Sequence, residues 1–288
     1  MTYYLVLPLF YLICALPGRA QRALASFLYW VLYHVVHYRV SVVRGNLRRS
    51  FPEKSEQERA TIEMKFYRHL ADVFLETIIL ATMSARKIKE CIEFINVDQI
   101  ERYTAGRSWI AAMAHYGSWE YTISWGLHST HDKVLAVYRP LADKGFDRYF
   151  RQIRSRFGVD PVAMESVARE LVRFRQNGQN VTLALIADQN PPRVSNNWVT
   201  FLGQPTLFFN GMEKLAHKFN MPVAFMHIDK FDKGHYKAWM EVIYDGREVL
   251  AEGEITRRYA ACLEAMIRER PELWMWSHRR WKHTPNED

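Results

Sequence analysis

The sequence is poor in cysteine: its 288 residues include only Cys14, Cys91 and Cys262. An odd number of widely separated cysteines provides neither a disulfide framework nor the paired spacing of a zinc knuckle. We therefore expect the bulk of the chain to face a reducing cytoplasm. The sequence also lacks a G-x-S-x-G motif, which disfavours a serine hydrolase, and it lacks an H-E-x-x-H motif.

Long apolar runs are missing as well. The N-terminal stretch "TYYLVLPLFYLICALPG" is apolar for roughly 15 residues, fewer than the roughly 20 that a spanning helix needs, and Pro8 interrupts it. It has neither the basic start of a signal peptide nor the small residues expected before a lipidated cysteine, so we expect it to stay on the chain. A second run, "ALASFLYWVLYHVVHY", is followed by arginines, a pattern typical of a segment held at the cytoplasmic face of a membrane. We expect residues 1–43 to be this membrane-associating helical segment; the alternative is two core helices of a soluble protein.

What the sequence does have is positive charge and aromatic side chains. The formal net charge is +8, and 14% of the residues are aromatic. A basic chain favours anionic partners such as acidic lipid, a phosphorylated substrate, nucleic acid or an acidic carrier protein. Amphipathic aromatic rings are favoured at the membrane–water interface, and no recognised nucleic-acid motif occurs. Lipid is therefore the preferred partner, and we expect no binding of nucleic acid.

Short apolar runs alternate with helical or loop stretches through the rest of the chain. A helical period over 50–83 begins at Pro52 and Ser55. The runs "WIAAMA", "KVLAVYR", "VTLALIAD", "PVAFMHI" and "YKAWMEVIY" then predict strands. This alternation predicts an α/β fold, with a mixed central sheet layered with helices. We take residues 44–288 as the catalytic domain, since no internal repeat or Gly/Ser linker divides them.

The stretch "AAMAHYGSWE" places His115 at the carboxyl end of a predicted buried strand, where open α/β sheets carry their sites. One continuous helix would leave His115 and Glu120 roughly 140° apart, because five residues turn through about 500°. A strand, a turn at Gly117 and a new helix capped by Ser118 bring the two side chains together. The pair then resembles a general base, His115, with an orienting acid, Glu120. The alternative is a chance spacing, because the chain holds eleven histidines.

A metal site is not expected. The segment "HSTHD" has a loosely metal-like spacing of His128, His131 and Asp132, but it lies in a predicted polar turn. We expect these side chains to be solvated.

The stretch "HYGSWE" resembles the H-x-x-x-x-D/E motif of the lysophospholipid acyltransferase superfamily. Five further stretches resemble its lipid A late acyltransferase branch, the lauroyl and myristoyl transferases, in order and approximate spacing. They are "VVRGNLRRSFPE", "VYRP", "IADQNPP", "VTFLGQPTLFFNGMEKLAHKFNMPV" and "WMWSHRRWK". Together they extend from about Arg44 to His283.

The resemblance implies an acyltransferase-like fold and a metal-independent acyl transfer that requires no cofactor. A fatty acyl thioester, most simply on acyl carrier protein, gives its chain to a hydroxyl of a lipid A precursor, with His115 as base and Glu120 as its partner. An alcohol needs a base before it attacks, whereas a thioester is already activated. The resemblance also implies a place at the bacterial inner membrane, with the catalytic domain on the cytoplasmic face. Related branches that acylate phosphoglycolipids or amino-acid lipids, and a non-catalytic membrane or carrier adaptor, are the alternatives.

Further residues are candidates for binding substrate. The resemblance favours Arg139 and Arg154 for phosphate contacts, which guanidinium groups make in bidentate geometry; a solvated helix face is the alternative for Arg154. Asp188 and Gln189 end a predicted strand at the same sheet edge as His115, so we expect them in the pocket wall. The backbone around Gly117 is a candidate oxyanion donor. The C-terminal stretch mixes aromatic and basic residues that suit headgroup contact, namely Trp276, Arg279, Arg280 and Trp281.

Overall fold

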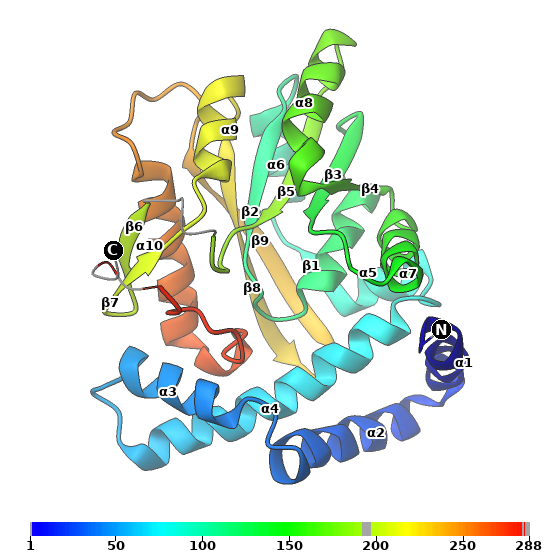
Figure 1. Ribbon diagram of the computed structural model, residues 1–288. Helices are drawn as coiled ribbons and strands as arrows, with labels where there is room; N and C mark the ends of the chain where they lie inside the picture. The colour runs from blue at the N-terminus through cyan, green and yellow to red at the C-terminus, as the bar shows by residue number, and fades with distance from the viewer. Residues whose placement is uncertain (1, 192–196, 284, 286–288) are drawn as a thin grey trace.

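The computed structural model describes residues 2–191, 197–283 and 285, and they form an α/β fold. Seven strands make one sheet in the order β1-β9-β8-β2-β5-β3-β4, and β6 pairs with β7 in a separate hairpin (Figure 1). The strands of the large sheet are β1 (Ile92–Phe94), β2 (Trp109–Met113), β3 (Lys133–Tyr138), β4 (Val159–Ala163), β5 (Val181–Ile186), β8 (Val223–Asp232) and β9 (His235–Tyr244). The hairpin consists of β6 (Trp198–Phe201) and β7 (Gln204–Leu207).

The sheet is mixed, as the sequence predicts. Strands β4, β3, β5, β2 and β8 run parallel, whereas β9 is antiparallel to β8 and β1 is parallel to β9. All five residues of β2 are buried. Continuous apolar runs such as this one suit a strand that is covered on both faces. Each of the five apolar runs singled out in the sequence overlaps one strand, which confirms those predictions.

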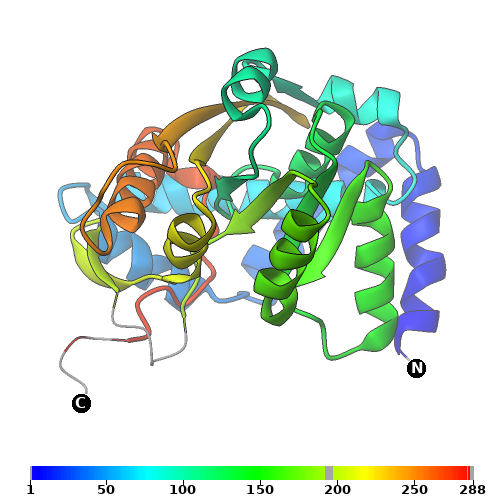
Figure 2. The same ribbon diagram turned by 90° about the horizontal axis from the view of Figure 1, so that it is seen from above.

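Helices cover both faces of the sheet. Figures 1 and 2 show α8 and α9 on one face and α5 and α6 on the other. The helices that follow residue 39 are α3 (Val40–Ser50), α4 (Glu56–Ile79), α5 (Ala85–Cys91), α6 (Val97–Thr104), α7 (Lys144–Ser155), α8 (Val167–Gln176), α9 (Gly211–Phe219) and α10 (Glu254–Glu269). Short 3-10 helices occupy Trp119–Leu127, Met164–Ser166 and Pro271–Leu273.

Helix α4 begins where the sequence predicts. The side chain of Ser55 accepts a hydrogen bond from the backbone N–H of Glu58, and the Glu58 carboxylate accepts one from the Ser55 N–H. This capping box satisfies two backbone donors that a helix start otherwise leaves unpaired. The 24-residue helix crosses beneath the sheet in Figure 1 and contributes Phe66 and Leu70 to the core.

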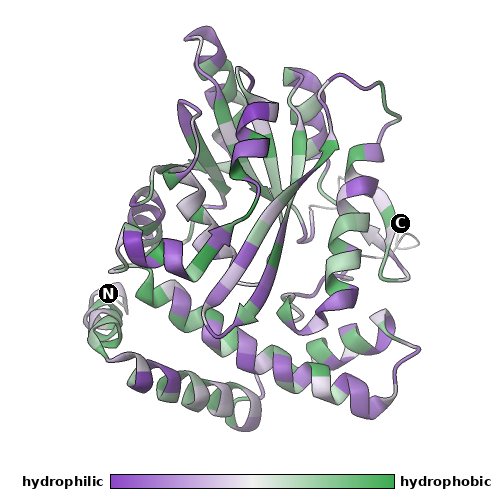
Figure 3. Cartoon of the chain, turned by 180° about the vertical axis from the view of Figure 1, so that it is seen from behind, coloured by the Kyte–Doolittle hydropathy of each residue, from purple (hydrophilic) through white to green (hydrophobic). Residues whose placement is uncertain are grey.

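The N-terminal segment forms α1 (Thr2–Ala15), α2 (Gly18–Trp30) and a π-helical turn, Val31–Val35. In the described part of the chain, no helix has the length and apolarity required to cross a membrane. The segment nevertheless exposes many large apolar side chains: Tyr4, Leu9, Tyr11, Leu12, Phe27, Trp30, Val35 and Val36. Green, hydrophobic stretches recur along these helices at the margin of the molecule in Figure 3.

Candidate active site

The loop after β2 carries His115 two residues beyond the last residue of the strand. The backbone of Gly117 has a φ of +57°, and a Cβ atom added there would lie 2.8 Å from Cγ2 of Ile228. Both facts require glycine, since a side chain would be strained and would clash. The sharp turn predicted at Gly117 is therefore confirmed.

The helix predicted after this turn is η2 (Trp119–Leu127), and it is a 3-10 helix. The expected cap is wrong, because the side chain of Ser118 makes no capping hydrogen bond to any described residue. The backbone N–H of Gly117 donates to the carbonyl oxygen of Leu273 at 3.0 Å. That contact corrects the expectation for Gly117 itself, since its N–H group is already engaged and is not free for an oxyanion.

Asp188 lies against the imidazole of His115. The Nδ1 atom of His115 is 2.7 Å from Oδ1 of Asp188, and the backbone N–H of His115 donates to Oδ2 at 3.0 Å. The strand register explains the meeting, because Met113 of β2 pairs with Ile186 of the parallel β5. Two residues beyond each member of that pair, the chain reaches His115 on one strand and Asp188 on the other.

The Asp188 carboxylate is buried and fully engaged. Its side chain is 2% exposed, and Oδ2 also accepts a hydrogen bond from the indole N–H of Trp274 at 2.9 Å. Burial alone would raise the pKa of Asp188, but the charge of His115 and the hydrogen bonds from His115 and Trp274 outweigh it and lower the pKa. Asp188 is therefore ionised and fixes the imidazole with Nδ1–H as donor.

The other ring nitrogen of His115 faces the cavity wall. Its Nε2 atom lies 3.3 Å from the side-chain nitrogen of Gln189, and 21% of the His115 side chain is exposed. With Nδ1–H donated to Asp188, Nε2 carries a lone pair that accepts from the Gln189 amide. The same lone pair is the one that a general base uses.

Glu120 pairs with Arg154 of α7. The Nε and Nη2 atoms of Arg154 donate to the two carboxylate oxygens of Glu120 at 3.1 and 2.6 Å. Burial alone would lower the pKa of Arg154, but the charge and hydrogen bonds of Glu120 raise it. This bidentate ion pair is partly buried, with 13% of Glu120 and 22% of Arg154 exposed.

The expected direct partnership of Glu120 with His115 is therefore corrected. Among the described residues, the hydrogen bonds of the imidazole go to Asp188 and Gln189, and those of Glu120 go to Arg154. Glu120 and His115 nevertheless line one cavity. The structure thus brings the two together in one site without a hydrogen bond between them.

This cavity has a volume of about 760 Å³ and lies between the sheet and helices α4, α7, α8 and α9. Its polar lining includes His115, Glu120, Arg139, Arg154 and Gln189, so five of the residues predicted from sequence share one site. Most of the wall is apolar. Examples are Leu70, Val73, Ile123, Val134, Phe150, Ala184, Ile186, Met212 and Leu215. A deep apolar chamber with a few convergent polar groups is the usual form of a binding site for a largely apolar ligand.

Arg139 follows β3 at the rim of this cavity. The residue is exposed, and within the described chain it takes part in none of the ion pairs. A guanidinium that is free of carboxylates remains available to an anionic group of a ligand. Arg154 differs, because a ligand must compete with Glu120 for it.

The C-terminal stretch lies mostly inside the protein. Trp276 is 0% exposed and Arg280 is 1% exposed, so the expected headgroup contacts of these two residues are wrong for this structure. Their burial follows from packing: the Trp276 indole lies against Trp274, and the Arg280 guanidinium lies over the ring of Phe208. Arg279 is exposed and Trp281 half-buried, with its indole N–H donating to Thr206.

Sequence reasoning missed the contribution of this stretch to the site. Trp274 holds Asp188, and Met275 lines the cavity. His278 accepts a hydrogen bond from the backbone N–H of Asn190 at 3.3 Å, and burial lowers its pKa to about 4. Three tryptophans within eight residues were the available signal, because large rings are most often buried.

The segment with metal-like spacing differs from the expectation at His131, whereas Asp132 is exposed as expected. The side chain of His131 is 3% exposed and bonds to Glu101, which is 8% exposed. His131 therefore has a buried side chain paired with Glu101 and is not a solvated turn residue.

One comparison with known proteins identifies a family. A family model described as bacterial lipid A biosynthesis acyltransferase matches residues 1–283. The search of curated proteins returned no match. Since the match covers nearly the whole chain, the protein belongs to the bacterial lipid A biosynthesis acyltransferase family.

Proposed function

We propose that the chain moves a fatty acyl group from a thioester on acyl carrier protein to a hydroxyl of a lipid A precursor, with His115 as general base. The observation that carries the proposal is the placement of Nε2 of His115 at the wall of an apolar cavity of about 760 Å³, while Nδ1 is held by Asp188. The cavity supplies an apolar environment for an acyl chain, and the base stands beside it.

The reaction follows from this arrangement. The acceptor hydroxyl replaces the Gln189 amide at Nε2 and gives its proton to His115 as its oxygen attacks the thioester carbonyl. When the tetrahedral intermediate collapses, the carbon–sulfur bond breaks, and the imidazolium returns the proton to the departing thiolate. The buried Asp188 carboxylate stabilises the imidazolium in between. A thioester needs no further activation, so the proposal includes no cofactor.

The charged side chains suit an anionic lipid acceptor. Arg139 at the cavity rim makes no ion pair with the residues that the structure describes and can bind a phosphate, and Arg154 holds Glu120 in the cavity wall. In this proposal Glu120 and Arg154 act as a pair in the cavity wall, on the side of His115 where the substrate binds.

We place the protein at the cytoplasmic face of the bacterial inner membrane. The support is the apolar surface of α1 and α2, where Phe27 is 59% and Trp30 is 51% exposed, next to the basic residues Arg19 and Arg22. Apolar side chains flanked by positive charge suit an interface with anionic lipid.

The test is transfer of a radiolabelled acyl chain from acyl carrier protein to a Kdo-modified lipid A precursor in detergent micelles. We expect wild type and the control His235→Ala, altered at the start of β9, to transfer, and His115→Ala and Glu120→Ala to lose transfer while they stay folded. Full activity of His115→Ala would overturn the proposed base. No transfer by wild type, together with consumption of the donor when whole lipid extract is added, would move the acceptor to another lipid.

A further inference from the structure

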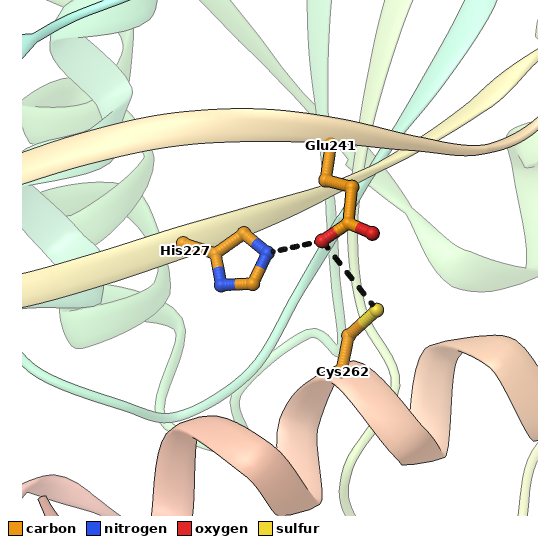
Figure 4. A group of neighbouring side chains, drawn as sticks. All are labelled: His227, Glu241 and Cys262. Atoms are coloured by element: carbon orange, nitrogen blue, oxygen red, sulfur yellow. Dashed lines mark hydrogen bonds and ion pairs between the residues drawn. The ribbon is translucent and has the colours of Figure 1, made fainter. Parts of the chain in front are cut away.

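A second cluster of reactive side chains lies outside the cavity. His227 of β8, Glu241 of β9 and Cys262 of α10 point toward one another (Figure 4). The Nε2 atom of His227 is 2.9 Å from Oε2 of Glu241, and Sγ of Cys262 is 3.9 Å from the same oxygen. The three potential ligand atoms all lie within 4.8 Å of one another.

This cluster is separate from the proposed site of acyl transfer. Successive residues of a strand point to opposite faces of the sheet. Met226 lines the cavity, so its neighbour His227 points to the other face, where Phe225 packs against Tyr259 of α10. The cluster therefore requires an explanation of its own.

We propose that His227, Glu241 and Cys262 bind one Zn²⁺ ion, with water as the fourth ligand. Imidazole nitrogen, thiolate sulfur and carboxylate oxygen are the three ligand types that zinc takes in proteins, usually in tetrahedral geometry. Bonds of about 2.0–2.3 Å place neighbouring ligand atoms roughly 3.3–3.8 Å apart. The observed separations lie on both sides of this range, so side-chain shifts of about 1 Å suffice. When the zinc–sulfur bond forms, the thiol proton passes to solvent.

The scaffold holds one of the ligands, His227, in place before zinc binds. The ring of His227 stacks on Trp239, with centroids 4.9 Å apart and planes at 2°, and meets Phe225 edge-on at 4.8 Å. Its orientation is thus set by packing, which a binding site on rigid elements needs. Glu241 is 57% exposed, so water and zinc have access from solvent.

Such a site has no signature in the sequence, because the three ligands come from two strands and a helix without motif spacing. A zinc ion bound here would link the β8–β9 hairpin to α10 and would stabilise the fold. An ion that binds only the folded chain raises its stability by mass action.

The test uses the full chain in detergent micelles, stripped with chelator and titrated with Zn²⁺ and Co²⁺. We expect one metal ion per chain and a thiolate-to-cobalt charge-transfer absorption. Cys262→Ser and His227→Ala should lose the absorption and weaken zinc binding at least about 10-fold. Cys14→Ser, the matched control at another half-buried thiol, should bind as wild type does. Substoichiometric binding to wild type, or unchanged binding to Cys262→Ser and His227→Ala, would overturn the proposal.

A second readout does not depend on spectroscopy. Zinc should raise the Tm of wild type and of Cys14→Ser but not of Cys262→Ser. If Cys262→Ser does not fold, Glu241→Gln replaces it in this test, because Glu241 is exposed. Zinc should not raise the Tm of Glu241→Gln either. Acyl transfer by Cys262→Ser should equal that of wild type, and an equal zinc-induced rise in the Tm of all variants would contradict the assignment.

Discussion

The Nδ1 atom of His115 and the Oδ1 atom of Asp188 lie 2.7 Å apart, although 73 residues separate them in the sequence. Parallel pairing of Met113 with Ile186 produces this contact, since each residue stands two positions beyond a paired one. The relationship makes Asp188 the residue that orients the proposed base. Because Asp188 contacts His115 and Glu120 contacts Arg154, substitutions can test the effects of Asp188 and Glu120 on the reaction separately.

Replacing Asp188 with Asn should lower kcat about 10²- to 10⁴-fold, the range associated with general acid–base catalysis. The amide keeps the shape of the side chain but removes the charge that stabilises the imidazolium, so KM should change little. The control is Asp160→Asn, a half-exposed carboxylate of β4 that pairs with Lys133. A kcat within twofold of wild type would show that Asp188 only packs against the ring.

The pair of Glu120 and Arg154 should be energetically coupled. A double-mutant cycle with Glu120→Gln and Arg154→Met should give a coupling energy of about 1–3 kcal/mol in urea unfolding, because contacting, partly buried charges depend on each other. The same cycle on Glu170 and Arg173, a surface pair in α8, should give about 0.2–1 kcal/mol. Equal values for the two pairs would mean that the Glu120–Arg154 pair is solvated.

Gly117→Ala should destabilise the protein more than Gly178→Ala. Both glycines have positive φ angles, +57° and +69°, so both substitutions carry about 1–2 kcal/mol of backbone strain. Only at Gly117 does the added methyl group meet Ile228, which adds about 1–3 kcal/mol of overpacking. Urea unfolding of the two variants measures the difference, and transfer should fall only in Gly117→Ala because the displaced loop carries His115. Equal destabilisation would mean that the Ile228 side chain moves aside to accommodate the added methyl group.

His278 should contribute to the acid sensitivity of the fold. Burial lowers its pKa from 6.5 to about 4, so between these values the unfolded chain takes up a proton that the folded chain does not. Stability therefore falls as the pH drops from about 6.5 to about 4 and is unaffected by this group above that window. His278→Gln keeps an acceptor for the Asn190 N–H and should flatten the slope of the free energy of unfolding against pH. An unchanged slope would contradict the burial of a neutral imidazole.

The location of the site could be predicted from the sequence because it follows from local patterns. A continuous apolar run that ends in a histidine and a glycine indicates a buried strand and a turn, and the run before Asp188 indicates a second one. Both strands therefore deliver their polar residues to one sheet edge. His115 and Gln189 line the cavity, as predicted. The prediction that Asp188 lies in the cavity wall is wrong, because its carboxylate is buried behind His115.

The sequence could not predict which side chains of the site pair with one another. These pairs depend on the strand register and on segments that are distant in sequence. Glu120 is five residues from His115, which favours contact, but the 3-10 helix directs it to Arg154. Asp188 reaches His115 through the β2–β5 pairing. Trp276 and Arg280 lie in a stretch that mixes tryptophans, which favour burial, with basic residues, which favour the surface, and in the structure both residues are buried.

Membrane binding should depend on the exposed apolar side chains of α2. Phe27→Glu combined with Trp30→Glu removes two rings that are 59% and 51% exposed, and partial burial of each ring in lipid is worth about 1 kcal/mol or more. The double variant should partition into vesicles containing anionic lipid at least about 10-fold more weakly than wild type. The matched control is Phe231→Glu near the C-terminal end of β8, a ring that is 56% exposed and belongs to neither α1 nor α2. It should bind as wild type does, because the substitution leaves the apolar surface of α1 and α2 intact. If Phe231→Glu weakens partitioning as much as the α2 variant, hydrophobic exposure in general drives adsorption and the membrane face lies elsewhere. If neither substitution has an effect and salt alone releases the protein, the basic charge holds it at the surface, and Arg19 and Arg22 become the residues to replace.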